Sequence, residues 1–247
     1  MSESPAPNAS ELAVAEIERR LQWRAMPALM FLGILGLLLG VAFWPSVFPP
    51  KHVAGLPDDP DVFAAANLLR AHVALPATEL RFESALTGDV VPGMPAPPDA
   101  DERLTQAALL IHEARGRLAH DVRMQVARAT LDLMQHRYRD AERRYHAAVN
   151  RYSSYPEADL GLGVTLTLAG ELERNALAQR QRFLRAIAQF AAVTPSDAEY
   201  EEALFDRAIL LDRVGRREEA LRYARDYLGR GAVVGAERMR AIVGGGG

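Results

Sequence analysis

The chain of 247 residues contains no cysteine. Without thiols it has no disulfide framework, no cysteine nucleophile and no thiolate metal site. It also lacks a Gly-rich phosphate loop, a G-x-S-x-G nucleophile elbow and an H-E-x-x-H zinc motif. The sequence therefore predicts a protein that is not an enzyme, with no catalytic residues and no cofactor.

An excess of one charge sign is also missing, because 29 basic residues stand against 32 acidic ones and the net charge is −3. A nucleic-acid binder would be expected to carry a basic face, so this balance argues against nucleic acid as a partner. The six histidines are scattered. His112 and His120, eight residues apart, could share a helix face, but they have no evident third ligand. We predict no metal site, and a metal- or haem-handling role for this pair is kept as an alternative.

One long hydrophobic run is present, and it organises the rest of the chain. The 19 residues from Met26 to Trp44 include no charged side chain. At about 1.5 Å of rise per residue, a helix from Trp23 to Trp44 is roughly 30 Å long, which places the two tryptophans at opposite membrane interfaces. No A-x-A cleavage site follows this run. We predict a single uncleaved transmembrane helix over 26–44, preceded by a partly helical tail over 1–25.

Glycines mark one face of this predicted span. Gly33, Gly36 and Gly40 follow one another at i, i+3 and i+7. Such a stripe allows close approach of a second membrane helix, although glycine is also simply common in membrane helices. The span contains no ionisable side chain, so it offers no haem ligand, proton relay or ion path. It is expected to act as an anchor in the lipid bilayer.

Basic residues beside the span indicate its orientation. Arg19, Arg20 and Arg24 precede it, whereas Lys51 is the one basic residue in the following 20 or so. Cytoplasmic flanks carry the positive excess, so the tail is predicted to be cytoplasmic and the C-terminal part external. The chain has 28 arginines and one lysine, a composition typical of GC-rich bacteria. We therefore expect a protein of the bacterial inner membrane with a periplasmic domain.

Prolines and glycines divide the external part. Five prolines over 45–60 predict an extended linker. Apolar residues at helical spacing predict a helix from Asp61 to Leu75, and a shorter one over 77–86. The proline-rich stretch 88–98 then separates a membrane-proximal unit, 61–98, from the main body. A flexible glycine tail is expected over 244–247.

From 99 to 243 the pattern is helical, and alternating or β-branched runs typical of strands are missing. The predicted fold class is therefore all-α. Short breaks separate helices of roughly 12 to 22 residues, which predicts antiparallel hairpins stacked in series. The breaks fall near Gly116 to Asp121, His136 to Arg139, Ser153 to Pro156, Gly170, Thr194 to Ser196, Gly215 and Gly229 to Ala232.

Small and large residues recur at set offsets within these hairpins. The last unit carries Leu204, Ala208, Leu211, Gly215, Ala220, Tyr223 and Tyr227; the first carries Ala129, Ala141, Tyr145 and Ala148; the middle one carries Leu162, Gly163, Leu166 and Gly170. In these positions the chain resembles the tetratricopeptide repeat family, over about Val122 to Gly231. The family's unit is a helical hairpin of about 34 residues in which small residues let paired helices approach. The resemblance implies a TPR-like solenoid; an irregular alanine-rich bundle is the alternative.

Two features depart from the family pattern. Ala224 stands where a bulky residue is usual, and Pro195 comes about eight residues late. The helix from Leu172 to Val193 is therefore expected to be about two turns too long for regular stacking.

The resemblance also implies a ligand-binding concave face on the first helix of each hairpin. Its members would be Arg123, Val126, Thr130, Glu157, Leu160, Val164, Glu202, Phe205 and Ile209. This mixture favours a protein segment as ligand, because it is neither basic enough for phosphate nor aromatic enough to stack bases. Alternatively, these residues pack on a further helix such as Leu172 to Val193.

Anchor and repeats together predict a non-catalytic scaffold or accessory subunit. It would dock on the periplasmic side of a larger inner-membrane complex and stabilise its assembly. Similar layouts occur in translocon-associated proteins, in cytochrome c maturation and in respiratory or photosynthetic complexes. The alternative is a tethered periplasmic module that binds peptides or chaperone clients.

Overall fold

The computed structural model describes residues 55–70, 79–90, 98–152 and 155–245, all within one compact unit, His52–Gly247. The predicted membrane span over 26–44 lies outside these residues, as do its helix-packing glycines and interface tryptophans: Gly33, Gly36, Gly40, Trp23 and Trp44. Within the described ranges no helix is both long and apolar enough to cross a bilayer.

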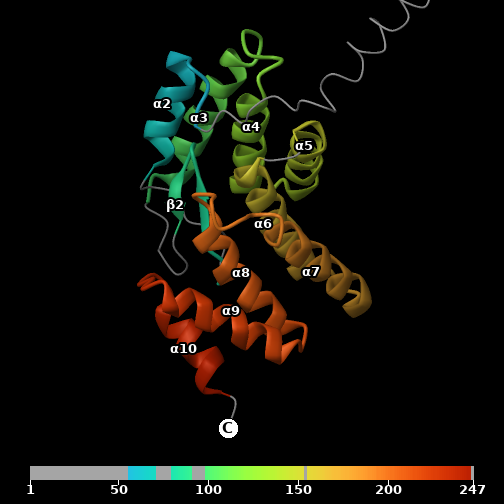
Figure 1. Ribbon diagram of the computed structural model, residues 1–247. Coiled ribbons are helices and arrows are strands. Elements are labelled where there is room, and N and C mark those ends of the chain that lie inside the picture. Colours follow the sequence, from blue (N-terminus) through green and yellow to red (C-terminus); the bar gives the residue numbers. More distant parts are fainter. Residues whose placement is uncertain (1–54, 71–78, 91–97, 153–154, 246–247) are drawn as a thin grey trace, which may run out of the picture. The chain divides into compact units, whose positions relative to one another are not determined.

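The described part of the chain is all-α apart from one small hairpin (Figure 1). Consecutive helices pack in pairs: α2 with α3, α4 with α5, α6 with α7, and α8 with α9, while α10 packs on α9. The helices are α2 (Pro60–Leu69), α3 (Ala100–Ala114), α4 (Val122–Met134), α5 (Tyr138–Arg151), α6 (Pro156–Glu171), α7 (Ala176–Phe190), α8 (Tyr200–Arg213), α9 (Arg217–Gly229) and α10 (Ala236–Gly244). Strands β1 (Phe82–Ser84) and β2 (Gly88–Val90) form an antiparallel pair.

Local side-chain chemistry sets several helix starts. Asp59 accepts a hydrogen bond from the Asp61 amide at 3.0 Å, with Pro60 at the first helical position of α2. Asp121 accepts one from the Arg123 amide at 2.8 Å at the start of α4. These are N-cap bonds to amides that have no partner inside the helix, so they fix where each helix begins.

Two of the helical pairs are joined by the same turn. His136 after α4 and Gly215 after α8 both have positive φ, 59° and 80°. In each turn the following amide bonds back to a helix carbonyl: Arg137 to Asp132 and Arg216 to Leu211, both at 2.8 Å. This is the Schellman arrangement that ends a helix and reverses the chain. Both turns coincide with predicted breaks.

Glycines in α6 allow its neighbours to approach closely. A Cβ added at Gly161 would lie 2.3 Å from Cζ of Tyr145 in α5, and one at Gly163 would lie 2.4 Å from Cε1 of Phe190 in α7. Both aromatic side chains are buried, so α6 packs between rings from two sides. Only glycine leaves room for these contacts.

The helix predicted over Leu172 to Val193 is shorter than expected. α7 has 15 residues, close to the 14 of α5. Asn175 caps it by accepting from the amides of Leu177 and Ala178, which delays its start. The remaining residues of the predicted helix lie in the turns on either side of α7. In the turn before α8, Asp197 accepts a hydrogen bond from the Thr194 amide at 2.7 Å.

The helix predicted over 77–86 is wrong where the chain is described, because the β-hairpin takes its place. Phe82 and Ser84 are buried while Glu83 between them is only partly so, which is the two-residue period of a strand. Ser84 and Thr87 close the turn, with 2.9 Å between their hydroxyls, and Gly88 follows with φ of 70°. Such local side-chain bonds compete with a helix. The other predicted helix, from Asp61, ends at Leu69; residues 71–75 lie outside the described part.

Candidate functional site

The predicted concave face is buried, and the β-hairpin covers part of it. Of its nine residues, all except Arg123 are inside the protein. We call the sides of α4, α6 and α8 that meet residues 79–90 the inner face. β1 packs against α6, and its flanking residues reach α8 (Figure 1). The chain's own segment therefore lies where a peptide ligand was expected.

Apolar side chains attach the hairpin at both of its ends. Leu80, Phe82 and Val90 belong to the hydrophobic cluster that contains the cores of α4 to α10. Leu86, at the turn, belongs to a second cluster with α2, α3 and one side of α4. Leu80, Phe82 and Leu86 are fully buried. Burying one such side chain stabilises a protein by about 1.5 to 3 kcal/mol, so the hairpin is part of the core.

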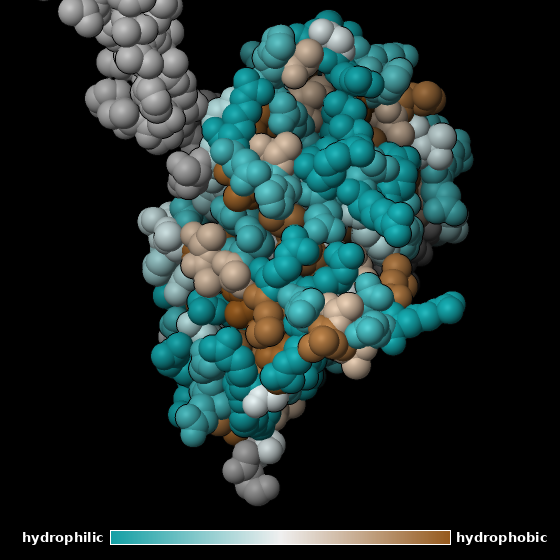
Figure 2. Space-filling model, turned by 90° about the vertical axis from the view of Figure 1, so that its right-hand side faces the viewer, coloured by the Kyte–Doolittle hydropathy of each residue, from teal (hydrophilic) through white to brown (hydrophobic). Residues whose placement is uncertain are grey.

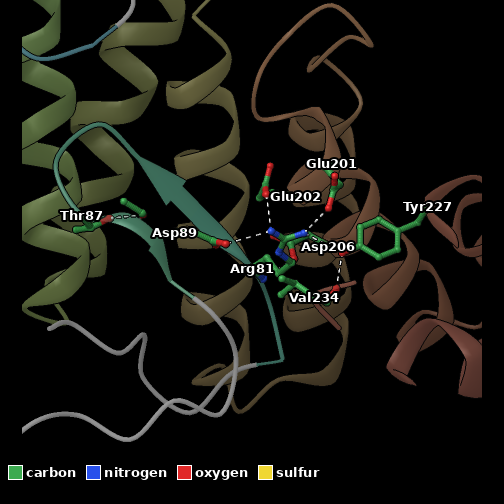
Figure 3. A network of polar contacts seen from close by, with 9 residues as sticks. Arg81, Thr87, Asp89, Glu201, Glu202, Asp206, Tyr227 and Val234 are labelled. Carbon is green, nitrogen blue, oxygen red and sulfur yellow. Dashed lines mark hydrogen bonds and ion pairs between the residues drawn. The ribbon is translucent and has the colours of Figure 1, made fainter. Parts of the chain in front are cut away.

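Arg81 holds the hairpin to α8 and α9 (Figure 3). Its backbone amide donates to Asp206 at 2.8 Å. One terminal nitrogen of its guanidinium donates to Glu201 at 2.9 Å and to the Tyr227 hydroxyl at 2.8 Å. The other lies 2.7 Å from Glu202.

The same nitrogen that meets Glu202 also donates to Asp89 of β2, at 3.2 Å. The Arg81 side chain is only 4% exposed. Tyr227 in turn donates to the Val234 carbonyl, so the network continues into the segment before α10. One guanidinium thus connects the hairpin to α8 and α9 and, through Tyr227, to the segment before α10.

Carboxylates outnumber the cation in this network. Burial alone would lower the pKa of Arg81, but Glu202 and the other partners raise it overall. Burial raises the pKa of Glu202 to about 7, against the opposing effect of Arg81. Burial likewise raises the pKa of Asp206 well above its usual range. Arg81 opposes this rise in the pKa of both Glu202 and Asp206, so it favours their charged forms.

A second polar contact fixes the hairpin turn. Glu157 at the start of α6 accepts a hydrogen bond from the Ala85 amide at 3.0 Å. The pKa of Glu157 is raised to about 8, chiefly by burial and also by Glu199 and Glu83 nearby, while the Ala85 amide opposes the rise. Arg70, directly after α2, donates to the Ala85 carbonyl at 2.9 Å. Both backbone groups of Ala85 are thus bound by side chains from other elements.

The remaining predicted face residues have structural partners. Thr130 bonds to the Tyr145 hydroxyl at 2.8 Å, so it joins α4 to α5. Phe205 packs against Tyr227, with ring centroids 5.4 Å apart. The others, Val126, Leu160, Val164 and Ile209, are core residues. Arg123 pairs with Asp121 and donates to the Leu56 carbonyl at 3.1 Å.

The sequence prediction contained Glu157 and Glu202 but missed Arg81, Asp206 and Tyr227 as a network. Two features of the sequence indicate this network. Leu80 and Phe82 flank Arg81 in an alternating pattern, and Asp206 interrupts an apolar stretch of α8. A charged residue inside such a stretch indicates a buried partner.

His112 and His120, the pair considered for metal binding, lie apart in the secondary structure: His112 is in the last turn of α3 and His120 in the loop before α4. Among the described residues no three His, Asp or Glu side chains are grouped to hold a metal ion.

The inner face therefore binds a chain segment that presents an arginine, a turn amide and apolar side chains. The chain's own β-hairpin segment presents all three. Comparison of the chain with models of known families, with curated proteins and with solved structures finds no match.

Proposed function

We propose that the protein is a non-catalytic scaffold or accessory subunit. The span at 26–44 anchors it in the bacterial inner membrane, and its TPR-like helices dock on the periplasmic side of a larger membrane complex. The repeated Schellman turns and the glycine-mediated packing of α6 support a TPR-like array. The glycine stripe and the arginine flank in the sequence support the anchor and its orientation.

The occupied inner face is the observation that favours docking over free peptide binding. A client peptide would have to displace Leu80, Phe82 and Leu86 from the core and Arg81 from its carboxylates. Removing one partner of a buried ion pair costs about 3 to 5 kcal/mol, in addition to the apolar burial lost. A partner that binds the outer surfaces avoids both costs.

Helix α7 offers such an outer surface. Leu177 and Leu184 are 67% and 38% exposed and lie seven residues apart, on one side of the helix. Figure 2 shows a side face of the molecule on which apolar side chains lie among hydrophilic ones. Two leucines at this spacing suit a subunit surface that covers them.

Affinity purification of the full chain from membranes in mild detergent tests the proposal. We expect a stoichiometric complex with the wild type and loss of it with Leu177→Glu and Leu184→Glu together. Arg225→Gln, at an exposed position of α9 away from this face, is the control. If no stable partner accompanies the wild type, the scaffold role is wrong.

The tethered peptide binder remains the second candidate, supported by the way Arg81 and Ala85 are held. A synthetic peptide of residues 79–90 provides the probe. If the inner face exchanges segments, this peptide should bind the Arg81→Ala chain, whose own hairpin is weakened, more tightly than the wild type. A peptide with alanine in place of its arginine should not bind. Binding of neither peptide to either chain would exclude this role.

A further inference from the structure

A cavity of about 570 Å³ lies between α3, α4 and α5, lined by different residues from those of the inner face. Four arginines line it: Arg115 after α3, Arg128 in α4, Arg137 in the turn and Arg144 in α5. They are far apart in sequence, so the packing of three helices brings them together.

The cavity contains more positive than negative charge. Asp132 is its one acidic lining residue, and its side chain is 5% exposed. It accepts hydrogen bonds from Arg144 at 2.6 Å and from Arg137 at 2.9 Å. Four guanidiniums against one carboxylate leave a formal excess of three positive charges.

The guanidiniums of the other two arginines have no ion-pair partner among the described residues. The guanidinium of neither Arg115 nor Arg128 makes a hydrogen bond or ion pair with any residue in the described part of the chain. Burial lowers the pKa of Arg128, as do Arg144 and Arg115, while Asp132 partly opposes this. A partly buried guanidinium among like charges is stabilised when an anion binds beside it.

The rest of the lining adds specificity. Ala108, Ile111 and Leu131 form an apolar side, together with Leu109, which is 60% exposed. The Oε1 atom of Gln135 is buried and accepts no hydrogen bond from the described residues. The cavity thus combines guanidiniums, an apolar side and one free acceptor.

We propose that this cavity binds a phosphate monoester. Guanidinium forks match phosphate oxygens in geometry and charge, and a dianion offsets most of the excess. The organic group of the ester can contact Leu109, and a hydroxyl on that group, where it has one, can donate to Gln135. The ligand is either the headgroup of an anionic lipid or a soluble phosphorylated metabolite, which share this chemistry.

Calorimetric titration of the full chain in a non-ionic detergent tests the site with two probes. Glycerol 3-phosphate represents the soluble source and dihexanoyl phosphatidic acid the lipid source. Wild type should bind at least one probe saturably at one site. Arg115→Gln with Arg128→Gln should weaken that binding at least about tenfold, because two of the charged donors are removed. The matched control Arg180→Gln removes an exposed arginine of α7 and should bind as wild type does.

Both substitutions remove repelling cations, so the double variant should melt no lower than wild type. A measurement on the wild type alone adds an independent check: the bound probe should raise its melting temperature, and sodium chloride at equal ionic strength should not. At least about tenfold tighter binding of the lipid than of glycerol 3-phosphate assigns the site to a headgroup. Similar affinities assign it to a soluble ligand. Absence of saturable binding by either probe, or equal affinity in wild type and double variant, would overturn the proposal.

Discussion

Glu157→Gln should make the protein less sensitive to alkaline pH. Glu157 is 5% exposed, and its carboxyl accepts a hydrogen bond from the amide of Ala85. Burial raises its pKa from 4.5 to about 8. At neutral pH the folded protein therefore keeps a proton on this group that the unfolded chain releases. Glutamine has the shape of the protonated acid and can still accept the Ala85 hydrogen bond.

The sign and size follow from this difference in pKa. A carboxyl whose pKa is raised by folding contributes stability that is complete below about pH 4.5 and is lost as the pH rises toward 8. One pKa unit corresponds to about 1.4 kcal/mol, so the loss between about pH 4.5 and pH 7 is on the order of 3 kcal/mol. Wild type should suffer this loss, and Glu157→Gln should not.

Urea unfolding of the full chain, followed by circular dichroism at several values between about pH 5 and pH 8, measures the effect. Asp159 and Glu202 titrate in the same range, since burial raises their pKa values to about 6 and about 7. The difference between wild type and variant isolates Glu157. Glu218→Gln, at an exposed position of α9, is the control. If wild type and Glu157→Gln lose stability in parallel across this range, the buried-carboxyl explanation is refuted.

Four other experiments test the packing, the anchor and its orientation. Gly161→Ala and Ala208→Leu should each lower the free energy of unfolding by about 1 to 3 kcal/mol through overpacking. The new Cβ of Gly161→Ala would lie 2.3 Å from the Tyr145 ring, and Ala208 is fully buried. Unchanged melting of either variant would contradict the packing described. Gly36→Leu with Gly40→Leu should reduce co-purification with the proposed complex, and retention equal to wild type would mean that the span is only a tether. A reporter that works only outside the cytoplasm should be active after Ile242, whereas activity at the N-terminus instead would reverse the topology.

Local patterns explain why the helices could be predicted. The breaks near His136 and Gly215 depend on residues within one turn. The glycines of α6 permit close helix packing wherever they occur, so their positions in the sequence already indicate it. The length of α7 was misjudged because a late proline suggested a continuous helix, whereas Asn175 caps it later than expected. Side-chain caps compete with propensity at helix ends, which are the least predictable positions.

The occupant of the inner face could not be predicted in the same way. The strands of the hairpin have three residues each, too few for an alternation to be distinguished from chance. Arg81 meets Glu201 and Tyr227 at separations of 120 and 146 residues. No local pattern specifies such a pairing. Only the folded chain shows that the face expected to bind a ligand is covered from within.

This segment also changes how the helical array should behave. In a simple solenoid each repeat contacts only its neighbours, so its stability is a sum of local terms and the ends can unfold separately. Here Leu86 packs with α2, α3 and α4, while five residues earlier Arg81 binds α8 and α9. Unfolding the last helical pair, α8 and α9, would leave Arg81 buried without its carboxylates and expose the apolar residues beside it. The β-hairpin therefore couples both ends of the array, so we expect α2 to α9 to unfold cooperatively as one unit.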